Sequence, residues 1–170
     1  MIARMKVVRQ GSRGGAIVAL ILAVLAAGFA AGAAQAERHP DLEVVIGAEA
    51  PRAFSREALA AMPQTEIVTH TPWTEGAQVF RGVALAALLD GVDESATLEL
   101  TALNAYSVSI PADAISDDLP VIAIERNGAP MSVREKGPYW LVYPFDETAF
   151  QTETFYSRSI WQLVRITVEP

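Results

Sequence analysis

Cysteine is absent from all 170 residues of this chain. Without a thiol the chain can form no disulfide, and thiolate catalysis and thiolate metal ligation are both excluded. Histidine is nearly absent as well, because only His39 and His70 occur. A Ser/His/Asp hydrolase would have to use His70, but the sequence contains no Gly-x-Ser-x-Gly motif. We therefore expect no metal centre and assign no catalytic residue.

Basic residues are scarce after position 36. Four of the 13 Lys and Arg residues lie before Ala36, which leaves nine against all 20 Asp and Glu and gives a net charge of −11. A surface of this charge repels polyanions, so nucleic-acid binding is not expected. The scattered charges are also typical of an ordinary solvated surface.

The first 36 residues have the three parts of a secretory signal peptide. The basic part contains Arg4, Lys6, Arg9 and Arg13 and no acidic residue. An apolar run over residues 16–31 follows, and the small-x-small sequence Ala34-Gln35-Ala36 closes it. A membrane anchor is the alternative, although Ala and Gly make this run a weak span. We expect cleavage near Ala36, a periplasmic or secreted location, and no membrane insertion of the mature chain.

The rest of the chain, residues 37–170, has a length that suits one domain. Ser55 is expected to cap a short helix that ends before Pro63, and Gly82 to turn the chain into a second helix over 83–89. Asn127-Gly128 predicts a hairpin turn. The expected strands cover residues 42–46, 65–69, 77–80, 97–103, 106–110, 121–125, 139–143 and 163–168. This pattern predicts an α+β domain, mainly β-sheet with short helices.

Five motifs follow one another in an order that resembles a known family. They are Phe80-Arg81-Gly82-Val83-Ala84-Leu85, Leu103-Asn104-Ala105-Tyr106-Ser107-Val108, the run from Ala123 to Met131 before Lys136-Gly137-Pro138, Leu141-Val142-Tyr143-Pro144, and the run from Ser159 to Ile166. Together they resemble the molybdopterin-binding domain of the sulfite oxidase family, in a small exported form, over about residues 66–168. The resemblance implies that fold and, for an active member, a molybdopterin-dependent oxidoreductase.

The chain departs from that family at positions that concern the cofactor. The resemblance implies a molybdenum-ligating Cys soon after the strand that ends at Thr69, and the chain has none. A neutral hydroxyl of Thr69 or Thr71 would be a poor substitute for a thiolate. Near the carboxyl end the family places a Lys toward the pterin where this chain has Trp161. Arg158 or Arg165 would then have to supply the charge, although Arg165 also alternates like a solvent-facing strand residue.

The amino end departs from the family's export route too. Exported members that carry the cofactor leave the cytoplasm folded on a twin-arginine signal, and the start Arg4-Met5-Lys6 has no such pair. A Sec-type signal implies that the chain crosses unfolded and without cofactor. We therefore expect a degenerate pocket with no cofactor. The alternative is a molybdopterin-dependent oxidoreductase with a non-Cys ligand, so whether the protein is an enzyme stays open.

The expected remnant of the pocket supplies the candidate site. The loop after Thr69 replaces the metal-ligating segment; in it His70 can donate or accept hydrogen bonds and Trp73 offers a flat wall with one N–H donor. Alternatively, His70 is a solvated loop residue, Trp73 caps the core, and Tyr106 is an ordinary amphipathic strand residue. The candidates for ligand contact are His70, Thr71, Trp73, Asn104, Tyr106 and Arg158.

Aromatic and polar side chains are interleaved over residues 145–156. Such a segment is either a partner-facing loop or a packed irregular loop, while Trp140 and Trp161 are expected in the core. Three functions stay open: a module that binds a small molecule or a periplasmic or membrane-bound sensor or enzyme protein, an oxidoreductase, and a purely structural accessory protein.

Overall fold

The computed structural model of the protein describes residues 40–169. The predicted signal peptide, residues 1–36, lies outside this range. Among the described residues, no helix is both long and apolar enough to cross a membrane.

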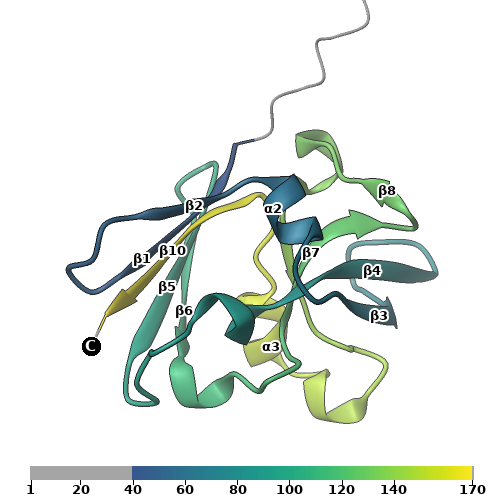
Figure 1. The fold of residues 1–170 in the computed structure, drawn as a ribbon. Helices are drawn as coiled ribbons and strands as arrows, with labels where there is room; N and C mark the ends of the chain where they lie inside the picture. Colours follow the sequence, from purple (N-terminus) through teal and green to yellow (C-terminus); the bar gives the residue numbers. More distant parts are fainter. Residues whose placement is uncertain (1–39, 170) are drawn as a thin grey trace, which may run out of the picture. The chain divides into compact units, whose positions relative to one another are not determined.

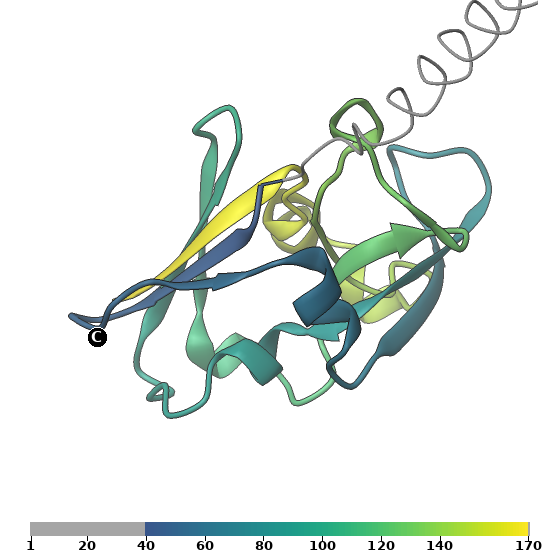
Figure 2. The ribbon, with the colours of Figure 1, turned by 45° about the horizontal axis from the view of Figure 1, so that its top comes forward.

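One sheet joins the two ends of the domain. Its strands lie in the order β2 (Arg52–Phe54), β1 (Leu42–Ile46), β10 (Leu163–Glu169), β5 (Thr97–Ala102) and β6 (Ser107–Pro111). Figures 1 and 2 both show the yellow β10 beside the blue β1, and these two strands are parallel. Along β5 the side chains alternate, with Leu98 and Leu100 fully buried and Glu99 exposed. This period of two turns one face of the sheet to the core.

The second sheet is built around a strand that is buried on both faces. Its strands lie in the order β3 (Thr65–His70), β4 (Ala77–Ala84), β7 (Val121–Arg126) and β8 (Ala129–Pro130), and β9 (Trp140–Val142) also pairs with β7. In β7 the four residues from Val121 to Ile124 are fully buried. Ile122 and Ile124 pack in the main core, and Ala123 packs on the other face against Phe80 and Trp140. A continuous apolar run, rather than alternation, is what such a strand requires.

The helices are short. They are α2 (Arg56–Ala60), α3 (Glu153–Arg158) and the 3-10 turns η1 (Leu85–Leu88), η2 (Ala112–Ala114), η3 (Val133–Glu135) and η4 (Thr148–Phe150). The predicted Ser55 cap is confirmed, because the Ala58 N–H donates to Ser55 Oγ at 3.1 Å. The predicted hairpin is also confirmed, since Asn127 and Gly128 both have positive φ, 53° and 77°. An α+β domain made mainly of sheet is therefore what the chain forms.

The prediction at Gly82 was wrong. Gly82 does not turn the chain into a helix, because β4 continues to Ala84 and only the four-residue η1 follows. A Cβ on Gly82 would lie 1.9 Å from the carbonyl oxygen of Ile122 on β7. The pairing of β4 with β7 also shifts register between Arg81 and Gly82. Glycine at this position thus permits two backbones to approach closely at a bulge.

The aromatic segment before the last strand is packed, as one of the two alternatives predicted. The helix α3 begins within it, at Glu153, where no helix was predicted. The rings of this segment pack on Tyr143, with ring centroids 5.8 Å away for Phe150 and 5.0 Å for Phe155. Trp140 is fully buried, whereas Trp161 is only partly buried at the edge of the same aromatic region.

Candidate functional site

The strand β3 separates neighbouring candidates of the predicted pocket. Thr69 is fully buried, His70 is exposed, and Thr71 is buried again. Successive side chains of a strand point to opposite faces. Candidates adjacent in the sequence therefore lie in different surroundings.

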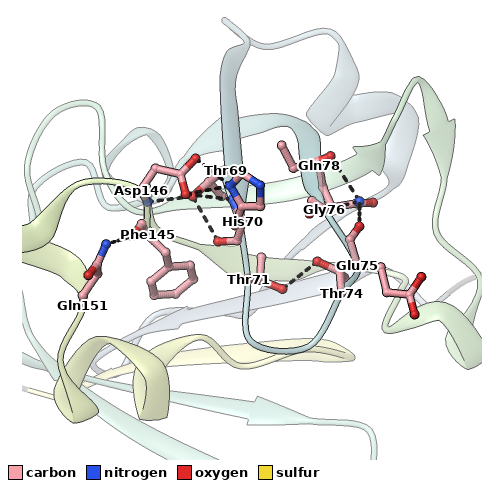
Figure 3. Close-up of polar contacts among 11 residues, drawn as sticks. Thr69, His70, Thr71, Thr74, Glu75, Gly76, Gln78, Phe145, Asp146 and Gln151 are labelled. Atoms are coloured by element: carbon pink, nitrogen blue, oxygen red, sulfur yellow. Dashed lines mark hydrogen bonds and ion pairs between the residues drawn. The ribbon is translucent and has the colours of Figure 1, made fainter.

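His70 forms an exposed clasp with Asp146 (Figure 3). Its Nδ1 lies 3.0 and 3.1 Å from the two carboxylate oxygens, and its backbone N–H donates to Oδ1 at 3.2 Å. The Asp146 N–H in turn donates to Thr69 Oγ1 at 3.1 Å. The backbone N–H of His70, and then its imidazole, lower the pKa of Asp146. The side chains of His70 and Asp146 are 64% and 50% exposed, so this clasp joins β3 to the segment after β9 at the surface.

The Thr71 hydroxyl shapes the loop that follows. It forms a 2.8 Å hydrogen bond with Thr74 Oγ1 (Figure 3). It also accepts the Trp73 N–H at 3.2 Å. Hydroxyl contacts of this kind stabilise tight turns. Thr71 therefore acts on the conformation of the loop that carries Trp73.

Trp73 is the centre of an aromatic cluster drawn from separate segments. Its ring centroid lies 5.5 Å from Trp161, 5.9 Å from Phe145, 6.0 Å from Trp140 and 6.2 Å from Tyr156. The rings are tilted or edge-on to one another, which is the favoured geometry for aromatic pairs. These ring contacts fix the β3–β4 loop against β9, against α3 and against Trp161, which precedes β10.

A cavity of about 290 Å³ opens beside this cluster. Its walls are formed by Trp73, Ala102, Asn104, Tyr106, Tyr156, Ser157, Ser159, Ile160 and Trp161. A second, more open hollow shares four of these residues, Trp73, Tyr106, Tyr156 and Ser157, and adds Pro72 and Glu153. The structure thus brings together the predicted candidates Trp73, Asn104 and Tyr106.

The remaining candidates lie elsewhere. His70 and Thr71 line neither hollow. Arg158 is the last residue of α3 and lies between the lining residues Ser157 and Ser159, but it does not itself line the cavity. Burial raises the pKa of the Tyr143 hydroxyl to about 12, and the nearby Arg158 charge lowers it by a smaller amount. Arg165 pairs with Glu43 at 2.7 Å on the exposed face of the first sheet, so it supplies no charge at the cavity.

Hydrogen bonds hold the polar lining groups in place. The Tyr106 N–H donates to Asn104 Oδ1 at 3.1 Å around Ala105, whose φ is 64°. Ser157 Oγ donates to the Thr154 carbonyl at 3.0 Å, and Ser159 Oγ donates to the Phe155 carbonyl at 2.8 Å. Because a serine has one hydroxyl proton, both side chains keep only acceptor capacity.

Sequence reasoning missed the contributions of α3 and of Lys136. Tyr156 ends the segment of interleaved aromatic and polar residues, 145–156, and Ser157 follows it directly; this segment was the only local signal of their role. The Lys136 ammonium lies 4.1 Å from the Trp161 ring centroid and 5.6 Å from that of Trp140. Burial, and then the Arg126 charge, lower the pKa of Lys136. The Gln162 N–H donates to the Lys136 carbonyl at 3.0 Å and holds this arrangement.

Comparison with known proteins supports the fold. No family model matches the chain, and no curated protein matches it. Among solved structures 27 chains match, including the sulfane dehydrogenase SoxCD from Paracoccus pantotrophus, with 20% identity over 77% of this chain and a TM-score of 0.57. This chain spans 38% of that SoxCD chain. The likeness supports a sulfite oxidase-like α+β fold, as the sequence resemblance implies, and at this identity it concerns the fold alone.

Proposed function

We propose that the domain is an exported small-molecule binding module that uses the cavity beside Trp73. The observation that carries this proposal is the convergence of Trp73, Asn104 and Tyr106, from the β3–β4 and β5–β6 connections, on one aromatic hollow. A concave site with aromatic walls and a few fixed polar groups is the usual form of a small-ligand site.

The residues present do not fit a molybdenum ligand set. The chain has no Cys, and soft thiolate sulfur is the donor that the sulfite oxidase resemblance implies. Thr69 is fully buried and its hydroxyl bonds to the His70 carbonyl and the Asp146 N–H. The Thr71 hydroxyl bonds to Thr74 and Trp73. Neither hydroxyl lines the cavity, so neither takes the place of the thiolate.

The cavity also does not fit the phosphate of a pterin cofactor. No Lys or Arg is among the residues that line its two hollows. The two serine hydroxyl protons are already donated to backbone carbonyls. The one charged lining residue is Glu153, which repels an anion. These observations support a module that works without the molybdenum cofactor.

Capture of a protein partner is a second candidate, favoured by exposed apolar side chains on neighbouring segments. Leu103, Tyr106 and Val133 are 44%, 53% and 37% exposed. The Leu103 N–H donates to the Gln162 carbonyl at 2.9 Å, and Gln162 Nε2 donates to the Val133 carbonyl at 2.8 Å. These contacts place the apolar side chains on neighbouring segments. A partner of this kind would be a periplasmic or membrane-bound sensor or enzyme protein.

A fragment screen tests the small-molecule proposal. The exported chain would be screened by ligand-observed NMR, and each hit would be repeated with Tyr106→Ala and His70→Ala. We expect hits that weaken at least about fivefold in Tyr106→Ala and are unchanged in His70→Ala. An absence of hits, or hits whose affinity is unchanged in Tyr106→Ala, would contradict the proposal.

Chemical analysis tests the cofactor part separately. Protein purified after export would be analysed for molybdenum and for released pterin. We expect both to be far below one per chain. One molybdenum and one pterin per chain would support the oxidoreductase alternative instead.

A further inference from the structure

Four aromatic residues line the cavity: Trp73, Tyr106, Tyr156 and Trp161. Trp73, Tyr156 and Trp161 form one group, with Trp73 5.5 to 6.2 Å from the other two centroids. Tyr106 lines the same cavity but forms no close ring pair with any aromatic residue in the part of the chain that the structure describes. Aromatic faces carry negative potential and attract cations.

Two of the polar side chains that line the cavity, Ser157 and Ser159, act as acceptors only. Ser157 and Ser159 have donated their hydroxyl protons to backbone carbonyls, so only oxygen lone pairs are left for a ligand. These groups suit a ligand that donates hydrogen bonds or carries positive charge.

Charge around the cavity favours the same class of ligand. Its two hollows are lined by no Lys or Arg, and Glu153 adds a carboxylate to the outer one. The chain after Ala36 carries a net charge of −11, because nine basic residues face 20 acidic ones. A field of this sign raises the local concentration of cations.

The position of Lys136 shows that a ring of this cluster accepts a cation. The charge of Lys136 also limits the affinity of the cavity for a second cation. Its ammonium lies 4.1 Å from the centroid of Trp161, so a cation already rests on one wall of the cluster. Lys136 itself is not among the residues that line the cavity. Its charge repels a second cation, whereas Glu153 attracts it.

We propose that the cavity selects a small organic cation, a quaternary or protonated amine. This inference rests on the proposed function and names the ligand class of the same site. The ammonium group would lie between the ring of Tyr106 and the rings around Trp73, with Glu153 at the outer hollow.

A matched pair of probes tests the proposal. Choline and 3,3-dimethylbutan-1-ol have nearly the same shape, but the alcohol has carbon where choline has its charged nitrogen. Titrations of the exported chain, followed by tryptophan fluorescence and NMR, would give both dissociation constants. We expect choline to bind about tenfold more tightly, the size of effect that desolvated cation–π contacts produce. Equal binding, or preferential binding of inorganic phosphate, would overturn the proposal.

Variants separate the contributions of charge and ring. Glu153→Gln should weaken choline binding about twofold to threefold, and Lys136→Gln should strengthen it by a similar factor, while neither changes the affinity for the alcohol. Glu49→Gln, in the exposed turn between β1 and β2, is the matched control and should change neither probe. Tyr106→Leu keeps apolar bulk and should weaken choline more than the alcohol. Equal losses for both probes in Tyr106→Leu would show that the ring acts only by apolar contact.

The outcomes distinguish this proposal from the proposed function. If fragments from the screen bind at Tyr106 but choline does not, the cavity binds ligands without selecting cations, and only this inference fails. If choline, the alcohol and the fragments all fail to bind a folded protein, the proposed function fails with it.

Discussion

The segment of residues 69–73 runs from the end of β3 into the β3–β4 loop, and its two halves place neighbouring candidates in different surroundings. In the first half, His70 faces solvent and forms a clasp with Asp146, and Thr71 bonds within the loop. In the second half, Trp73 packs on four rings and lines a cavity with Asn104 and Tyr106. The first half carries titratable and hydroxyl groups, yet they are used for structure. The second half carries less reactive groups, and they form the concave surface.

The comparison teaches that chemical versatility alone does not locate a site. His70 was the more versatile residue in the sequence, but its side chain lies on the exposed face of an edge strand. Trp73 reaches the cavity because the turn after Thr71 directs it toward β9 and α3.

Replacement of Trp73 should have the largest effect. Trp73→Ala removes a ring that contacts four others, and large-to-small changes at packed aromatic positions cost about 3 kcal/mol in free energy of unfolding. Urea unfolding measures the loss, and Trp73→Phe should recover part of it. A loss below about 1 kcal/mol in the alanine variant would mean that Trp73 does not hold the cluster together.

Removal of the Thr69 hydroxyl should come next. Thr69→Val keeps the shape of a fully buried side chain but leaves the Asp146 N–H without its acceptor. Such a change costs about 1 to 2 kcal/mol in free energy of unfolding. Thr101→Val on the outer face of β5 is the control, because its side chain is only partly buried. Equal stability of Thr69→Val and wild type would show that the Thr69 hydroxyl at the end of β3 has no structural role.

The His70–Asp146 clasp should have a smaller, pH-dependent effect. The pKa of Asp146 is lowered in the folded protein, so its charged form is favoured on folding. The resulting stability is complete above the ordinary carboxyl pKa of about 3.9 and is lost as the pH falls through the lower folded pKa. Asp146→Asn should therefore be less stable than wild type at neutral pH, and the difference should disappear in strong acid. Unfolding curves from pH 7 to pH 2 measure it, and a difference that grows in acid would contradict the assignment.

Removal of the Tyr106 ring should affect stability least. Its side chain is half exposed and stands apart from the other rings, so Tyr106→Ala should change the free energy of unfolding by less than about 0.5 kcal/mol. Its effect should fall on ligand affinity. A large loss of stability would instead make Tyr106 a structural residue and remove its value as a probe of the cavity.

Local signals in the sequence were enough for most of the strands. Alternation in β5, the Ser55 cap and the Asn127-Gly128 turn each act over a few residues, and each is confirmed. The role of Gly82 could not be predicted, because it depends on the backbone of Ile122 in a strand far along the chain. The general fold could therefore be predicted from the sequence, but the helix predicted over residues 83–89 begins where β4 continues to Ala84.

The candidate site was only half predictable, for the same reason. Trp73, Asn104 and Tyr106 were chosen from a family resemblance and do meet at one cavity. The His70 contact with Asp146 and the Lys136 contact with Trp161 join distant segments, and no local pattern indicates them. The contribution of α3 could not be predicted, because polar and aromatic side chains are interleaved over residues 145–156 without a clear helical period.

The most direct test of the central claim is an NMR titration of the protein with the tightest fragment from the screen. We predict that the indole N–H signals of Trp73 and Trp161 shift with ligand concentration while the backbone amides of His70 and Asp146 stay in place. Shifts at His70 and Asp146 with unmoved indole signals would contradict the account and place the binding site at the exposed end of β3.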